Sequence, residues 1–286
     1  LVFRGENFDN LASKLSSHKD EISEEKMLSL LFYFGDKAKH FYKNDDQKAG
    51  QSRWIKKIED TSVESGVVIF EKIRTILRKN NPEIKEFNEY NPCFFNFFTK
   101  NENKAYFSDR IANDQYIRDY YLYFLHTAGK IGIGDKSLLV STSRCYDVAN
   151  HFSSNAGTRY IIYYVIPSPS HNFAVSHLFH PPKILCSVMH VDLPTFAGKS
   201  LYPAQNEVAI KGALFSHHIL GVMAISPDNE EVFVANPHLF NKQNSHTSIL
   251  RGLRIDQSDF YNKLKKTNYY RGVGTYLDGN YHTLNI

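Results

Sequence analysis

The sequence predicts an α+β fold, because helical patterns dominate its first half and strand patterns dominate its second half. Apolar residues recur at helical spacing over residues 8–130, whereas short runs rich in β-branched and aromatic residues follow Gly129. The chain has 286 residues, 42% of them hydrophobic, which is enough to bury a core. We expect a single domain over 1–286, with a helical lobe at 8–128 and a β-rich core at 130–286.

The first five residues predict a short strand that carries Arg4 and ends in a glycine turn. All other predicted strands follow Gly129, so this strand has to return to a sheet formed by that later part of the chain. We therefore expect residues 1–5 to join the β-rich core. The helical lobe is then either an insertion or a layer of helices packed on that sheet.

Three helical faces are predicted in the lobe from apolar residues spaced three or four apart. They comprise Met27, Leu30, Leu31 and Phe34; then Val63, Val67, Phe70 and Leu77; then Ile117, Tyr120, Tyr121 and Phe124. A loop is expected at 44–52, and Asn80, Asn81 and Pro82 predict a helix stop.

The second half predicts a series of short strands interrupted by one short helix. The strands are expected at 137–140, 160–166, 184–191, 207–210, 219–225 and 231–234. The helix between the first two should present Val148, Ala149 and Phe152 on one face. A final helix is expected over 258–266, with Asp256 or Ser258 as its cap.

The charge and the cysteine content argue against two classes, nucleic-acid-binding proteins and disulfide-stabilised proteins. The formal net charge is only +4, which argues against a nucleic-acid-binding protein. Three cysteines predict no disulfide framework and favour a reducing compartment. No apolar run has the length of a membrane span, and no signal peptide is visible. Because the chain begins with Leu1, we expect an upstream segment to have been removed.

One segment contains four potential metal ligands. His177, His180, Cys186 and His190 lie close together in sequence, but their spacing matches no common zinc pattern. We therefore predict no metal site.

Three separated segments place polar side chains at the ends of predicted strands. Arg4 lies at the end of an apolar strand, Ser141-Thr142-Ser143 ends a second one, and Gln205-Asn206-Glu207 leads into a third. Each segment is common by itself, and the order and strand-end position of all three make the combination specific.

This trio resembles the Arg / Ser-Thr-Ser / (Glu or Gln)-x-Glu signature of toxin-like mono-ADP-ribosyltransferases. The likeness covers residues 1–5 and about 130–225, and it does not extend to 8–128 or beyond about 240. It implies a split β-sandwich core with a large helical insertion near its N-terminal end. It also implies that NAD is the cofactor and that nicotinamide is released.

The resemblance assigns roles to five residues around one nucleotide-sized cleft. Arg4 would bind the NAD pyrophosphate, because a guanidinium can bind phosphate oxygens bidentately. Ser141 would hold the catalytic Glu207, while Thr142 and Ser143 shape the nicotinamide-ribose site. Glu207 would stabilise the oxocarbenium-like ribose that forms as nicotinamide departs. Ser143 could also cap the helix expected to start near Arg144.

Gln205 indicates which kind of side chain would accept the ADP-ribose. If the segment is extended, Gln205 and Glu207 point to the same side, and a carboxamide can pair with another amide. We therefore favour a Gln or Asn side chain over Arg as acceptor. The alternatives are guanine in nucleic acid, or a binding module without turnover.

Four aromatic residues complete the expected site. Phe196 and Tyr202 lie in the loop that the resemblance associates with recognition of the protein substrate, although either could simply pack beneath it. Phe173 and Phe152 could stack on a ring of NAD, and core packing is the simpler account of both.

The resemblance finally implies a secreted bacterial effector and virulence toxin that acts in the host cytoplasm. Its acceptor would be a host protein, such as a small GTPase or another regulatory protein. Residues 8–128 would be available to bind a host activator. The identity of the acceptor and the role of residues 240–286 do not follow from the sequence.

Overall fold

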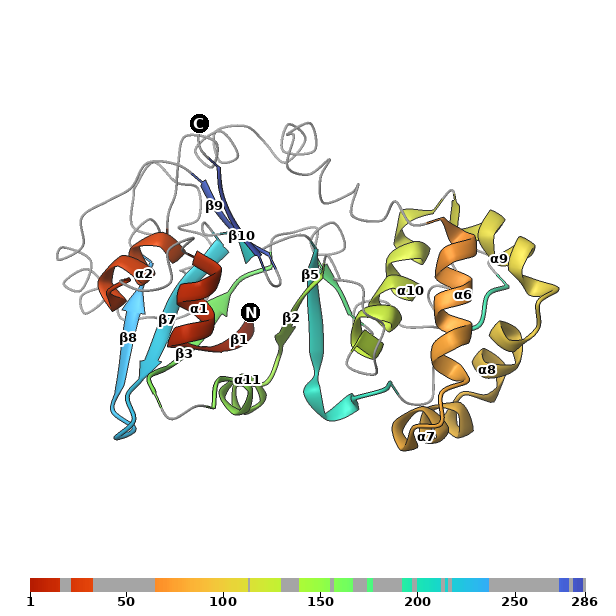
Figure 1. The fold of residues 1–286 in the computed structure, drawn as a ribbon, viewed down its shortest axis with the longest axis horizontal. Helices are drawn as coiled ribbons and strands as arrows, with labels where there is room; N and C mark the ends of the chain where they lie inside the picture. The colour runs from red at the N-terminus through yellow and green to blue at the C-terminus, as the bar shows by residue number, and fades with distance from the viewer. Residues whose placement is uncertain are drawn as a thin grey trace. The chain divides into compact units, whose positions relative to one another are not determined.

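The computed structural model describes residues 1–15, 22–32, 65–112, 114–129, 139–154, 157–166, 174–176, 192–196, 200–211, 214–215, 218–236, 273–277 and 280–284. Over these residues the chain combines helices with antiparallel strands, so the α+β prediction is confirmed (Figure 1). Backbone contacts group the chain into two compact units. Unit 1 comprises Leu1–Lys56, Val140–Pro167 and Gly212–Ile286, and unit 2 comprises Lys57–Leu139 and Ser168–Lys211. The single domain with a helical lobe at 8–128 stays a prediction.

Unit 1 contains an antiparallel sheet in which the first strand of the chain lies inside. The strand order is β2 (Leu139–Ser143), β1 (Val2–Asn7), β3 (Arg159–Tyr164), β7 (Ile219–Ile225) and β8 (Glu231–Ala235). β1 pairs with β2 at Phe3 and Ser143, and with β3 at Arg4 and Ile162. The expectation that the first strand joins strands of the second half is therefore confirmed, and Figure 1 shows β1 beside β3.

A smaller antiparallel sheet in unit 1 was not predicted from the sequence. It comprises β6 (Leu214–Phe215), β9 (Val273–Leu277) and β10 (Asn280–Leu284), in the order β10-β9-β6. β6 is two residues long, and glycine and polar residues interrupt the apolar residues of β9 and β10. Neither pattern resembles the apolar runs by which the other strands were recognised.

Helix α11 (Tyr146–Ser153) packs directly on β1 and β3. Gly5 makes this approach possible, because a Cβ atom there would lie 1.7 Å from the backbone oxygen of Ala149. The predicted face of this helix is only partly right: Ala149 is buried, whereas Phe152 is 50% exposed. Gly5 lies inside β1, so the glycine turn expected after Arg4 is wrong, and glycine is needed there for the close approach of α11.

Two short helices near the beginning of the chain also belong to unit 1. They are α1 (Phe8–Leu15) and α2 (Glu24–Leu31). Met27 and Leu31 are buried as the helical face predicted, and Phe34 lies outside the described residues. The Tyr160 hydroxyl on β3 donates to Glu24 Oε1 at 2.8 Å, which ties α2 to the sheet.

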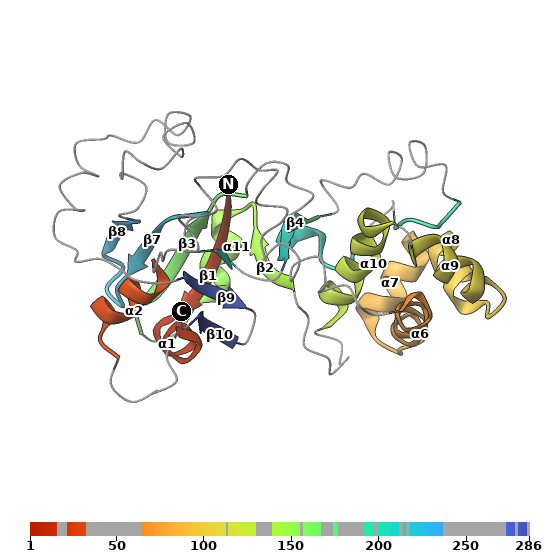
Figure 2. The same cartoon turned by 90° about the horizontal axis from the view of Figure 1, so that it is seen from above.

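Unit 2 is built around five helices that lie together in both views (Figures 1 and 2). They are α6 (Gly66–Leu77), α7 (Pro82–Tyr90), α8 (Pro92–Thr99), α9 (Asn103–Ala112) and α10 (Gln115–Ala128). Ser65, Asn81 and Asp114 cap the starts of α6, α7 and α10 with side-chain oxygens. The Asn80–Pro82 segment is therefore a helix start as well as a stop, since α7 begins at Pro82.

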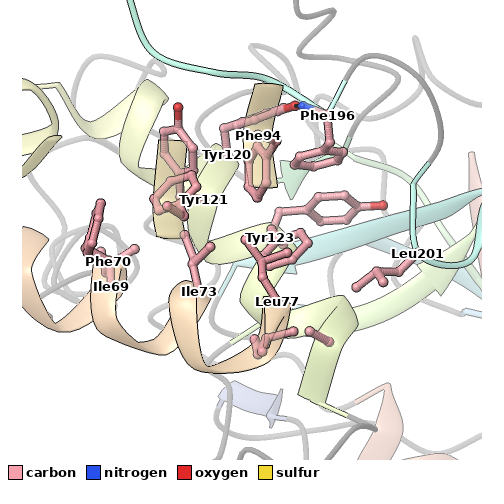
Figure 3. Close-up of a cluster of buried hydrophobic side chains, with 14 of the residues drawn as sticks. Ile69, Phe70, Ile73, Leu77, Phe94, Tyr120, Tyr121, Tyr123, Phe196 and Leu201 are labelled. Atoms are coloured by element: carbon pink, nitrogen blue, oxygen red, sulfur yellow. Dashed lines mark hydrogen bonds between the residues drawn. The ribbon is translucent and has the colours of Figure 1, made fainter. Parts of the chain in front are cut away.

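The core of unit 2 is rich in aromatic side chains, which pack among aliphatic ones (Figure 3). Phe94 makes ring contacts with Phe98, Phe124 and Phe196 at centroid distances of 4.7, 5.1 and 5.6 Å. The α10 face predicted from Ile117, Tyr120, Tyr121 and Phe124 is confirmed, because all four are buried. The α6 face is partly right: Phe70 and Leu77 are buried as predicted, Val67 is 45% exposed, and Val63 lies outside the described residues. The helix also buries Ile69, Ile73 and Ile76.

Unit 2 also contains a strand pair that carries candidate site residues. β4 (Ala174–Val175) pairs antiparallel with β5 (Glu207–Lys211), and the short 3-10 helix η3 (Pro203–Gln205) precedes β5. The strands expected at 207–210, 219–225 and 231–234 are thus confirmed as β5, β7 and β8. The loop at 44–52, the strand at 184–191 and the helix at 258–266 lie outside the described residues. None of the described helices combines the length and apolarity required to cross a membrane.

Candidate functional site

The candidate site residues fall into two sets, one in each compact unit. Arg4 and the Ser141–Ser143 segment lie in unit 1, whereas Gln205 and Glu207 lie in unit 2. The two sets differ in chemistry. Unit 1 supplies a cation and hydroxyl groups, and unit 2 supplies a carboxylate.

Arg4 in unit 1 is held by two contacts on different strands. Its Nε donates to Glu6 Oε1 at 2.8 Å, and its Nη1 donates to the backbone oxygen of Ser141 at 2.7 Å. Arg4 and Glu6 lie two residues apart on β1 and so share one face of the strand. The side chains are 12% and 4% exposed, so this charge-assisted pair is largely shielded from water. These contacts fix the orientation of the guanidinium plane.

The three hydroxyl residues form the end of β2 rather than a loop behind it. Thr142 and Ser143 are buried, and Ser141 is partly exposed. Ser143 Oγ accepts the backbone N–H of Cys145 at 2.9 Å, and Cys145 is the N-cap residue of α11. The expected capping role of Ser143 is therefore wrong: the cap residue is Cys145, two residues later, and Ser143 accepts a hydrogen bond from its backbone N–H.

Glu207 in unit 2 begins β5 and is anchored at both its side chain and its backbone. Its carboxylate Oε1 lies 3.1 Å from His126 Nε2 on α10. Its backbone oxygen accepts from Ser176 Oγ at 2.9 Å and from the Tyr123 hydroxyl at 3.3 Å. The Glu207 side chain is 9% exposed and that of His126 is 6% exposed. A carboxylate this shielded has few orientations open to it.

The polar face of α10 follows β5 from end to end. Asp119, Tyr123 and His126 are spaced by four and three residues, which places them on one side of the helix. His126 and Tyr123 contact Glu207 at the start of β5, and Asp119 forms an ion pair with Lys211 at its end. Both members of that pair are nearly inaccessible to solvent, with side chains 6% and 7% exposed. Helix and strand are thus joined by polar contacts at two places.

Gln205 does not share an extended segment with Glu207, contrary to the expectation. It ends the 3-10 helix η3, and Asn206 after it adopts a left-handed conformation with φ 46°. Asparagine tolerates this region better than most residues, which explains the residue type between Gln205 and Glu207. The argument that both side chains point to one side because of strand alternation is therefore wrong for this segment.

The predicted aromatic residues have different surroundings. Phe196 is 1% exposed and stacks on Tyr120 with a centroid distance of 4.6 Å, so it belongs to the core of unit 2. Tyr202 is partly buried against the same core, and burial raises the pKa of its hydroxyl, with Glu83 adding to the effect. Phe152 is exposed on α11. Phe173 lies outside the described residues.

The four residues weighed as metal ligands, His177, His180, Cys186 and His190, lie outside the described residues. Within the described part of the chain, no group of three or more His, Cys, Asp or Glu side chains is arranged to hold a metal ion.

Two residues of the candidate site were missed by the sequence reasoning. Glu6 could have been found from its position two residues after Arg4, because alternate residues of a strand share a face. His126 has a weaker signal: with Asp119 and Tyr123 it forms a polar stripe on the helix whose apolar face was recognised. The pairing of that stripe with β5 has no signal in the sequence.

Comparison with family models, with curated proteins and with solved structures finds no match to this chain.

Proposed function

We propose that the protein is a mono-ADP-ribosyltransferase that transfers ADP-ribose from NAD to a side chain of a host protein. The observation that carries the proposal is the bond from Arg4 to the Ser141 backbone, which brings two of the three motif segments together. These segments are 137 residues apart in sequence. The proposal includes a split β-sandwich of the ADP-ribosyltransferase type, and the two antiparallel sheets of unit 1 support that fold.

Arg4 would bind the pyrophosphate of NAD. A guanidinium matches the spacing of two phosphate oxygens, and lysine lacks this planar fork. Support comes from the contacts to Glu6 and to the Ser141 backbone, because they orient the guanidinium before any ligand binds. A pre-oriented group loses less conformational entropy on binding.

Glu207 would stabilise the ribose as nicotinamide departs. The bond between ribose C1′ and the nicotinamide nitrogen breaks with its electron pair going to nicotinamide, which leaves an oxocarbenium-like sugar. The acceptor nitrogen would then form a bond to C1′ and release its proton to solvent. A fixed carboxylate that bonds the ribose 2′-hydroxyl lowers the energy of the cationic transition state. The shielded and doubly anchored position of Glu207 supports this role.

The acceptor proposed is the amide of a Gln or Asn side chain, with Arg less favoured. The support is the chemistry of Gln205, whose carboxamide both donates and accepts hydrogen bonds and so matches another amide. Gln205 lies at the end of η3, two residues before Glu207, and is partly exposed. It would orient the acceptor while Ser141, Thr142 and Ser143 contribute to the ribose and nicotinamide site.

The test is nicotinamide release and transfer of label from labelled NAD in host-cell lysate. Glu207→Ala should lower the rate of release by roughly a hundredfold or more, the scale of losing one electrostatic stabiliser, about 3 kcal/mol. Glu89→Ala is the matched control, because Glu89 is an exposed carboxylate on α7. Equal release by wild type and Glu207→Ala would overturn the proposal.

Enzymatic digestion of the labelled product identifies the acceptor. Label lost on treatment with protease and retained after nuclease supports a protein acceptor. Label lost only to nuclease would assign guanine in nucleic acid instead. Absence of both label and nicotinamide release would leave a binding module without turnover.

A further inference from the structure

The contacts around Glu207 include one that the motif resemblance does not contain. His126 Nε2 lies 3.1 Å from Glu207 Oε1, and both side chains are nearly buried within unit 2. The two residues are 81 positions apart, so the contact exists only because α10 packs against β5. An imidazole nitrogen that carries hydrogen donates to a carboxylate oxygen, which fixes the carboxylate rotamer.

Helix α10 also contacts the backbone of Glu207. The Tyr123 hydroxyl, one turn before His126 on the same helix face, donates to the Glu207 backbone oxygen. The buried Asp119–Lys211 ion pair attaches the same helix to the other end of β5. Because the strand is attached at both ends, rotation or sliding of β5 against α10 would break at least one of these contacts. The carboxylate is therefore held by a rigid element, not by a loop.

We propose that His126 is a positioning residue for Glu207, an inference that rests on the proposed transferase function. His126 does not touch NAD in this proposal. It donates its Nε2–H to Glu207 Oε1, which keeps the carboxylate in the orientation needed to meet the ribose 2′-hydroxyl. Misplacing a catalytic group by about 1 Å can lower a rate roughly a hundredfold, so a loss of this bond should appear in kcat.

The test compares three substitutions of His126 in steady-state nicotinamide release by the full chain. His126→Ala should lower kcat roughly tenfold to a hundredfold, with KM for NAD changed by less than about threefold, because ground-state binding does not use the contact. His126→Gln should recover most of kcat, since its amide nitrogen can occupy the place of Nε2. His126→Asn should recover little, because its amide nitrogen reaches only as far as Nδ1.

The matched control is Thr127→Ala, the next residue on α10. The Thr127 hydroxyl donates within the helix to the Phe124 backbone oxygen rather than to Glu207. All variants are assayed well below their melting temperatures, which circular dichroism measures. A structural role alone would lower the melting temperature of His126→Gln and His126→Asn without separating their kcat values.

A second measurement does not depend on activity. In nitrogen NMR of the imidazole, we expect the Nε2–H tautomer of His126, with its proton protected from exchange in the wild type and not in Glu207→Ala. An unprotected Nε2–H in the wild type overturns the inference. So does full kcat in His126→Ala when Glu207→Ala is inactive, and in that case the proposed function stands. Full activity in Glu207→Ala overturns both.

Discussion

The guanidinium of Arg4 donates a 2.7 Å hydrogen bond to the backbone oxygen of Ser141 on the neighbouring strand. The same guanidinium is paired with Glu6, so one arginine connects a buried carboxylate on β1 with the serine segment that ends β2. This arrangement explains why an arginine in the first strand can be tied to a motif in the middle of the chain. It also gives Arg4 a structural role beside its proposed role in binding NAD.

The two roles of Arg4 are separable by replacement with lysine. Arg4→Lys keeps the positive charge beside Glu6 but cannot bind two phosphate oxygens through a planar fork. We expect KM for NAD to rise by about tenfold or more, equivalent to losing about 1.4 kcal/mol of binding, with a smaller effect on kcat. Steady-state kinetics of nicotinamide release measures this.

The control for the lysine replacement is Arg74→Lys on α6, where the arginine pairs with Glu71 at the surface of unit 2. An unchanged KM in Arg4→Lys, together with a lower melting temperature, would show that Arg4 only ties β1 to β2.

Gly5 should tolerate no side chain. In Gly5→Ala the new methyl group would lie 1.7 Å from the Ala149 backbone oxygen, so α11 would have to move off β1. We expect the free energy of unfolding to fall by about 3 kcal/mol or more. Urea unfolding followed by circular dichroism measures the change. Gly157→Ala is the matched control, because no atom lies within 4 Å of its added Cβ, and it should shift stability by at most about 1 kcal/mol.

Removing one member of the buried Asp119–Lys211 pair should lower the free energy of unfolding far more than replacing both members with apolar residues. Lys211→Met removes the cation and leaves the shielded Asp119 carboxylate without it, so we expect a loss of about 3–5 kcal/mol in unfolding free energy. The double variant Lys211→Met with Asp119→Leu should recover most of that loss, because no buried charge then remains at the pair. Urea titration of the two single variants and the double variant measures the coupling. Simple additivity of the single effects would contradict the pairing.

Tyr163 should make unit 1 less stable at alkaline pH. Burial is the main cause that raises its pKa from 10.0 to about 12, and Tyr146 and Glu231 add to the effect. Its stabilising contribution is complete below pH 10, where the phenol is neutral in both states. That contribution declines as pH rises from 10 towards 12, because the unfolded chain loses the proton first. Urea unfolding between pH 8 and 11 should therefore show a decline that is smaller in Tyr163→Phe, with Tyr90→Phe at an exposed position as control.

Local sequence patterns predicted much of the secondary structure. They failed where tertiary contacts determine which side chains are buried. The buried face of α10 follows from periodicity, because Tyr120, Tyr121 and Phe124 recur at helical spacing. The same reasoning placed Val67 on a buried face, although α6 turns that residue to solvent. Periodicity predicts which residues share one face of a helix. Which of those residues are buried depends on the elements that pack against the helix.

The candidate site shows the same division. Arg4 and Ser141 were selected from sequence and lie together in unit 1. Glu6, His126 and the Asp119–Lys211 pair were not selected, because each acts through a contact that the fold creates. The left-handed Asn206 is a further example. Strand alternation predicted that the side chains on either side of it point the same way, and its positive φ shows that the segment is not extended.

The internal position of β1 has a consequence for the order of folding. Phe3 pairs with both Tyr163 and Ser143, so β1 is synthesised long before either of the two strands that flank it. Helices α6–α10 can associate through nearby residues in the meantime, since contacts of low sequence separation form fastest. During synthesis, Val2–Asn7 is therefore an unpaired strand in need of protection from misassembly.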